Sequence, residues 1–82
     1  MRQEQYFQTS DLSLAVAISL FYPISKIDKE NPRKATFFFK SNDQLEGIAR
    51  SFWGEELKVS PLAYFNQLKA IKTRLYEEGN NG

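Results

Sequence analysis

The sequence predicts a small single-domain α+β protein, with three helices on one face of a mainly antiparallel sheet. Its 82 residues leave room for one core. Three segments have helical apolar periodicity, and the other apolar runs are short, β-branched or aromatic, and flanked by turn residues. The expected order is β-α-β-β-α-(β)-α. We expect the domain to cover residues 1–76 and the polar stretch 77–82 to be a disordered tail.

The first helix is expected to be the centre of the domain. After a short strand at Gln5–Gln8, Ser10 offers an N-cap hydroxyl and Asp11 a negative charge at the helix N-terminus. The helix is expected to run to about Tyr22, because Pro23 stops it. Apolar residues occupy nearly every face of this segment, a pattern typical of a buried helix.

Two strands, Ile24–Asp28 and Ala35–Lys40, are expected to follow the first helix. The segment 30–33 between them contains an Asn-Pro pair, which favours a turn. This connection is longer than a two-residue hairpin loop, so we expect an open turn or a bulge.

The second helix is predicted from a single apolar stripe that ends in Phe52 and Trp53, at least one of which should be buried against the first helix. Ser41 and Gln44 have the spacing of a capping box at its start. Gly54 is expected to be the left-handed residue that ends it.

The third helix should begin at Ser60-Pro61, which combines a capping hydroxyl with a proline at the first helical position. A short strand at Leu57–Val59 is expected to precede it. The residues of its inner face recur at helical spacing: Tyr64, Leu68, Ile71 and Leu75.

The composition argues against an enzyme. The chain has no cysteine and no histidine, so it lacks thiolate metal ligands and the commonest general base. Asp11 and Asp43 stand at expected helix starts, where a carboxylate has a structural role. Asp28 and Glu30 lie in a turn that lacks the other ligands of a calcium loop. We therefore expect no catalytic residues, no metal site and no cofactor.

The apolar stretch at residues 12–24 is interrupted by serines and a proline. It is shorter than the roughly 20 residues that span a bilayer. Acidic residues precede it and no small-residue cleavage site follows it, unlike a signal peptide. The expected location is therefore cytoplasmic, without membrane contact.

Several short motifs resemble an uncharacterised family of small prokaryotic and phage proteins, known only as a domain of unknown function. They are Thr9-Ser10-Asp11-Leu12 with Leu14-Ala15, Asn31-Pro32-Arg33 before Phe37-Phe38-Phe39, Phe52-Trp53-Gly54, and Val59-x-Pro61 with Phe65 and Leu68. The resemblance covers about Tyr6 to Tyr76 and implies a stand-alone domain, often linked to phages or mobile elements, with no known activity. This chain has Phe21-Tyr22-Pro23 where the family usually shows a glycine, so that corner is expected to differ.

The predicted hairpin is the candidate binding surface. Residues 26–40 carry five basic and two acidic side chains, whereas residues 41–56 carry one basic and four acidic ones. Alternation sends Phe37 and Phe39 to one face of the strand and Phe38 to the other. An aromatic ring among cations is typical of surfaces that stack single-stranded nucleic acid. The candidate residues are Lys26, Lys29, Arg33, Lys34, Phe38 and Lys40.

Other interpretations of the hairpin stay open. The lysines could simply solvate a strand edge and prevent aggregation, and Phe38 could be covered by a loop or by a second protomer in a homodimer. The sequence thus predicts a non-enzymatic binding module, either an accessory protein that contacts nucleic acid or a protein–protein adaptor or inhibitor-like modulator that uses the same face.

Overall fold

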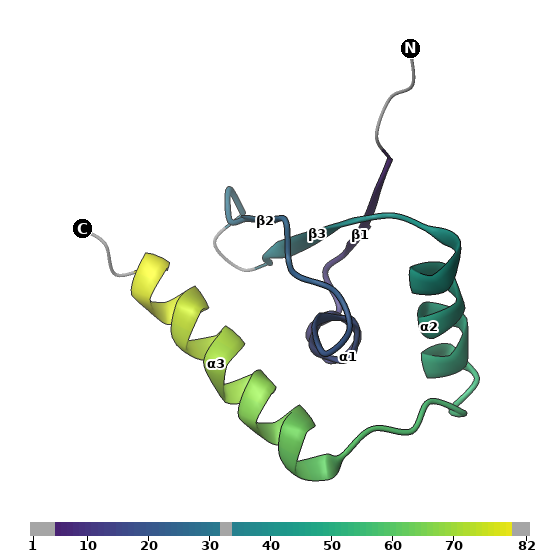
Figure 1. Cartoon of the computed structure of the whole chain (residues 1–82). Helices are drawn as coiled ribbons and strands as arrows, with labels where there is room; N and C mark the ends of the chain where they lie inside the picture. The colour runs from purple at the N-terminus through teal and green to yellow at the C-terminus, as the bar shows by residue number, and fades with distance from the viewer. Residues whose placement is uncertain (1–4, 32–33, 80–82) are drawn as a thin grey trace.

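The structure, a computed structural model, describes residues 5–31 and 34–79. It contains, in chain order, β1 (Tyr6–Thr9), α1 (Leu12–Ser19), β2 (Lys26–Asp28), β3 (Thr36–Lys40), α2 (Asp43–Trp53) and α3 (Pro61–Gly79). The three helices lie on one face of a three-stranded antiparallel sheet (Figure 1), which confirms the predicted α+β class. The optional short strand before α3 is absent from the described residues.

The sheet has the strand order β1-β3-β2, with both pairs antiparallel. β1 and β2 therefore run in the same direction on either side of β3, so β1-α1-β2 is a split βαβ unit. Phe37 pairs with Thr9 and Ile27, and Phe39 pairs with Phe7. Directly paired residues share a face, so these five side chains point toward the helices.

α1 is the centre of the domain, as predicted. Figure 1 looks along its axis and shows it beneath the sheet, between α2 and α3. Five consecutive residues, 14–18, are at most 1% exposed. A helix can bury every side only when other elements surround it, and here the sheet and the two flanking helices do so.

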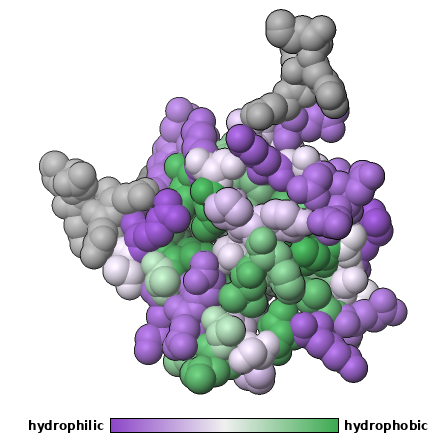
Figure 2. Space-filling view, in the orientation of Figure 1, coloured by the Kyte–Doolittle hydropathy of each residue, from purple (hydrophilic) through white to green (hydrophobic). Residues whose placement is uncertain are grey.

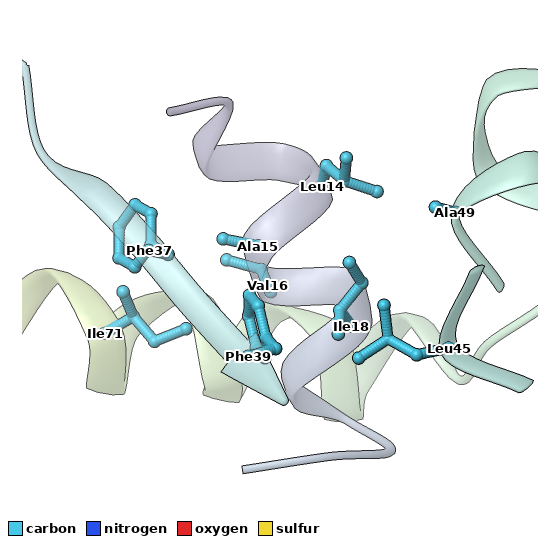
Figure 3. Packing of buried hydrophobic residues seen from close by; sticks show 9 residues of the cluster. All are labelled: Leu14, Ala15, Val16, Ile18, Phe37, Phe39, Leu45, Ala49 and Ile71. Carbon is cyan, nitrogen blue, oxygen red and sulfur yellow. The ribbon is translucent and has the colours of Figure 1, made fainter. Parts of the chain in front are cut away.

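The core forms where these elements meet α1 (Figure 3). Phe37 and Phe39 descend from the sheet, Leu45 and Ala49 come from α2, and Ile71 comes from α3. Each of the two Phe side chains removes roughly 150–250 Å² from water, a large share of the apolar burial in a chain of this size. Within the described part of the chain, no buried side-chain nitrogen or oxygen lacks a hydrogen-bond partner.

Asp11, not Ser10, caps the start of α1. Its Oδ1 accepts hydrogen bonds from the backbone N–H groups of Ser13 at 2.9 Å and Leu14 at 3.4 Å. The Ser10 hydroxyl instead lies 3.0 Å from the hydroxyl of Thr36. The expected cap was wrong by one residue, because Ser10 still faces β3 across the sheet and the helix turns away only after it.

α1 ends at Ser19, earlier than the expected Tyr22. The N–H groups of Phe21 and Tyr22 both donate to the carbonyl of Ile18, so the chain unwinds through a turn. Tyr22 precedes Pro23, which disfavours helical backbone at that residue, and the helix therefore opens before it. The strands also differ slightly from their predicted bounds: β1 lies one residue later, and β2 and β3 are shorter.

Asn42 caps α2, and the capping box expected of Ser41 and Gln44 is not formed. The Asn42 Oδ1 accepts the N–H of Leu45 at 2.8 Å. The N–H of Ser41 still donates to the Gln5 carbonyl at 2.9 Å, so this residue extends the β1–β3 ladder. As at α1, sheet pairing continues one residue past the expected strand end and delays the helix.

The left-handed residue after α2 is Glu55, with φ 61°, whereas Gly54 has φ −82°. The Glu55 N–H donates to the Phe52 carbonyl at 3.0 Å, and the Glu56 N–H donates to the Ser51 carbonyl at 2.8 Å. These two bonds define a Schellman motif whose left-handed position is usually glycine. The prediction that Gly54 would be left-handed was wrong by one residue.

The end of the α2 stripe is less buried than predicted. Phe52 is half-buried against the core, whereas Trp53 is 61% exposed and its ring centroid lies 6.5 Å from that of Phe7. The segment after it, Leu57–Val59, forms no strand. Figure 1 shows this segment on the side of α1 away from the sheet, where no strand edge is available for pairing.

α3 begins as predicted and ends later. The Ser60 Oγ accepts the N–H of Ala63 at 3.2 Å, ahead of Pro61. The predicted inner face is confirmed, since Ile71 is buried and its three companions Tyr64, Leu68 and Leu75 pack against the core. The helix continues to Gly79, beyond the expected boundary at residue 76, and residues 80–82 lie outside the described range.

We expect Glu55→Gly to stabilise the protein. Left-handed backbone costs a residue with a Cβ about 1–2 kcal/mol, and glycine removes this cost. The greater flexibility of glycine in the unfolded chain offsets about 0.4–1 kcal/mol of the resulting stabilisation. The net rise in the free energy of unfolding should therefore be at most about 1.5 kcal/mol, measured by urea denaturation. Gly54→Ala is the matched control, since an added Cβ there meets the Arg50 carbonyl at 3.4 Å and the flexible Glu56 side chain at 3.8 and 3.9 Å. A loss of stability in Gly54→Ala without a gain in Glu55→Gly would contradict this assignment.

Phe39→Ala should cost about 3–5 kcal/mol, because Phe39 is fully buried between the sheet and α1. That is a large part of the roughly 5–15 kcal/mol that stabilises a small domain. Phe52→Ala should cost about half as much, because its ring is half-buried. Thermal melts of both variants test this order. Equal losses would show that Phe52 belongs to the central core.

Candidate functional site

The face of the sheet turned away from the helices is the candidate site. Because Phe37 and Phe39 point toward α1, their neighbours along β3 point the other way. Cross-strand register adds residues of β1 and β2 to the same face. We call this set the open face: Tyr6, Gln8, Lys26, Asp28, Thr36, Phe38 and Lys40. All three helices lie on the opposite side of the sheet (Figure 1).

Phe38 is the central residue of the open face. It pairs with Gln8 on one side and with Lys26 on the other. The Lys26 ammonium lies 5.4 Å from the centroid of the Phe38 ring, within the range of a cation–π interaction. The ring itself is half-buried, so its outer surface meets the lysine rather than the core. The predicted neighbourhood of an aromatic ring and a cation is therefore present.

Tyr6 supplies a second aromatic ring beside Phe38. It pairs with Lys40, which places it diagonally across from Phe38, at the about 7–8 Å spacing of diagonal neighbours. The Tyr6 side chain is 46% exposed. Together with Ser25 and Lys26, the two rings line a hollow of about 430 Å³. This volume lies within the range of about 300–1,000 Å³ that small-ligand pockets occupy.

The other end of the open face is polar and less basic. The hydroxyls of Ser10 and Thr36 lie 3.0 Å apart. The Asp28 Oδ1 accepts the N–H of Glu30 at 3.0 Å, which directs this carboxylate toward the following turn. The aromatic rings and two of the predicted lysines therefore gather at the end formed by Tyr6, Lys26, Phe38 and Lys40.

The structure separates the remaining predicted residues from this cluster. Lys29 follows Ile27 in the alternation and points to the helix side, where its ammonium donates to the Leu75 carbonyl of α3 at 2.6 Å. Its expected place on the binding surface is therefore wrong. Lys34 is exposed in the β2–β3 connection, beside the end of the sheet. Arg33 lies outside the described residues.

Tyr6 is the residue that reasoning from sequence missed. Its alternation with Phe7 was visible in the expected first strand, but alternation alone does not say which strand lies beside it. The signal is the pairing of Tyr6 with Lys40, between residues far apart in the chain. Only a prediction of strand order together with register could have placed the two rings side by side.

The chemistry that this face offers is stacking and charge neutralisation. Exposed ring surfaces accept flat, unsaturated groups, and ammonium groups beside them favour anions. In the part of the chain that the structure describes, no group of three or more His, Cys, Asp or Glu residues could hold a metal ion. Over the same residues, no helix combines the length and apolar character needed to cross a bilayer.

Comparison with known proteins gives one result. No curated protein and no solved structure matches the chain. A family profile matches residues 4–77, which include the whole open face and all six helices and strands except the last two residues of α3. That family is described as a domain of unknown function, in agreement with the resemblance drawn from the sequence motifs. The chain belongs to this family, DUF5659.

Proposed function

We propose that this protein is a non-enzymatic binding module whose open face holds single-stranded nucleic acid. One observation carries the proposal: Tyr6 and Phe38 stand on adjacent strands across a shared hollow, with the Lys26 ammonium against one ring and Lys40 beside the other. A core-forming role does not explain these rings, because they point away from the helices.

Single strands fit this surface better than duplexes do. Bases in a duplex are stacked on one another, whereas unpaired bases can be splayed out onto aromatic side chains. Sheets that bind RNA commonly carry such rings on neighbouring strands, where two or three bases stack. Here the rings belong to β1 and β3, the neighbouring pair at one side of the sheet. The similarity between such RNA-binding sheets and this sheet is limited to the placement of the rings. It is an analogy that supports the proposal without assigning a function.

Lys26 has two positions in the proposed mechanism. Without a ligand its ammonium lies over Phe38, an interaction worth about 0.5–1 kcal/mol at an exposed site. A base that stacks on Phe38 takes this position, and the flexible lysine then reaches the adjoining phosphate. The base contributes roughly 1–3 kcal/mol by stacking, which exceeds the cation–π energy that is lost.

Modest affinity is expected, because the positive charge is local. The whole chain carries a formal charge of +1, so attraction comes from the lysines at and near the open face. Two or three phosphate contacts, from Lys26, Lys40 and Lys34, would give a slope of log affinity against log salt of about −1.4 to −2.1. Stacking depends little on base identity, so sequence preference should be weak.

Phe38→Ala and Tyr6→Ala should each weaken binding of a fluorescent single-stranded oligonucleotide by about 5- to 150-fold, the loss that corresponds to 1–3 kcal/mol of stacking. Anisotropy titrations of oligo-dT and oligo-U at low salt measure the change. Trp53→Ala removes an exposed ring that lies outside the open face and should leave affinity unchanged. Binding that ignores both open-face substitutions would refute the proposal.

A matched pair of lysine substitutions separates local contact from bulk charge. Lys26→Met and Lys29→Met each lower the net charge by one, but only Lys26 lies on the open face. Lys26→Met should make the salt slope shallower by about 0.7. Lys29→Met should leave the slope unchanged and lower the free energy of unfolding by about 1–3 kcal/mol, since it removes a charged hydrogen bond to α3.

Equal slopes in the two variants would mean that only total charge matters. The alternative is the predicted role as a protein–protein adaptor. That role replaces this proposal if no oligonucleotide binds at low salt and if, after nuclease treatment, a specific protein still co-purifies with the wild-type chain but not with Phe38→Ala.

A further inference from the structure

α3 carries a second stripe of large side chains that the core does not use. Leu62, Phe65 and Tyr76 are 68%, 54% and 65% exposed, respectively. With the lysines between them they form a series in alternating steps of three and four residues, which we call the outer stripe: Leu62, Phe65, Lys69, Lys72 and Tyr76. That spacing is the one at which one helix packs against another along a continuous seam.

The outer stripe is separate from the inner face of α3. At about 100° per residue, its centre lies roughly a third of a turn from the line of Tyr64 and Ile71 that faces the core. The helix surface that continues beyond Leu62, away from the inner face, carries small or polar residues: Ala63, Asn66, Ala70, Thr73 and Arg74. The exposed large apolar side chains of α3 are thus confined to the stripe, whereas a merely solvated helix surface would scatter them.

A groove adjoins the N-terminal half of this stripe. It has a volume of about 460 Å³ and runs between α1, the segment before α3 and α3 itself. Its apolar lining includes Phe52, Leu57, Val59 and Tyr64, and Phe65 forms part of its wall. One acidic side chain, Glu55, also lines it, so the basic character of this surface comes from the outer stripe and not from the groove. Figure 2 shows hydrophobic surface over this region of the molecule, between the hydrophilic surfaces of its margins.

The charge along the stripe is of one sign. The Lys69 ammonium lies 5.2 Å from the centroid of the Phe65 ring, and Lys72 follows on the same flank. No acidic residue occurs from residue 61 to residue 76. A surface that covers Phe65 and Tyr76 must therefore accept two ammonium groups between them, and acidic side chains would do so at the least cost.

We propose that the outer stripe and its groove dock an acidic amphipathic helix of a partner protein. Apolar residues of that helix would contact Leu62, Phe65 and Tyr76, and Asp or Glu side chains beside them would pair with Lys69 and Lys72. The mode is a helix laid along an apolar groove, with anchors at helical spacing.

Two other occupants fit less well. A second copy packed through the same stripe would bring lysines against lysines, which is repulsive. An interfacial helix on a membrane keeps its cations on the polar face, but here Lys69 and Lys72 lie between the apolar residues that would have to enter the lipid. An acidic helix satisfies both the apolar and the charged members of the stripe.

Two designed peptides test the proposal with the full chain. Both peptides carry Leu in alternating steps of three and four residues. The positions beside each Leu are Glu in one peptide and Lys in the other, and all remaining positions are Ala in both. The Glu peptide should bind at least about tenfold more tightly in fluorescence anisotropy, and Phe65→Ala should weaken it by about tenfold or more, as expected for an anchor residue. The double substitution Lys69→Glu/Lys72→Glu should reverse the preference between the peptides.

The controls keep this result separate from the open face. Ala63→Ser and Ala70→Ser alter the helix surface away from the stripe and should change nothing, and Phe38→Ala should leave peptide binding intact. Thermal melts confirm that each variant is folded. The proposal is wrong if the two peptides bind equally, if neither binds, if Phe65→Ala has no effect, or if anionic phosphatidylserine vesicles bind through Phe65 while the peptides do not.

Discussion

The fold depends on the burial of α1. Five successive residues of this short helix are shielded from water, which requires cover on every side. The sheet provides one side, and α2 and α3 provide the flanks. With the whole helical layer used to cover one side of the sheet, the described chain has no element left for the other. An open face is the consequence of enclosing this central helix within so few residues.

That constraint explains why aromatic side chains occur on both sides of β3. Phe37 and Phe39 lie on the helix side of β3, where they cover α1. Because side chains alternate along a strand, Phe38 between them points to the other side. The lysine over its ring reduces the exposure of apolar surface without filling a core position. The outer stripe of α3 is a different surface and shares no residue with the open face. Under the two proposals, a nucleic acid and a protein partner would not compete for the same side chains.

The helix ends show how sheet pairing changes local signals. Ser10 and Ser41 each stand where a capping residue was expected, yet both remain in register with a neighbouring strand, and the next residue caps the helix. Capping preferences are worth about 1 kcal/mol, so one additional hydrogen bond to the neighbouring strand, from the Ser10 hydroxyl or the Ser41 N–H, is sufficient to shift the boundary. At the end of α2 the Schellman bonds are formed even though Glu55, not Gly54, takes the left-handed position.

The sequence alone determined the fold class, the order of the main elements, the inner face of α3 and the outward direction of Phe38. Each of these follows from periodicity among residues close in the chain, which local sterics and burial control. Tertiary structure decided that Tyr6 stands beside Phe38, that Lys29 contacts α3 instead of lying on the open face, and that Trp53 remains exposed. These outcomes depend on register and packing between segments distant in the sequence, and no local pattern encodes which of several compatible neighbours a side chain will meet.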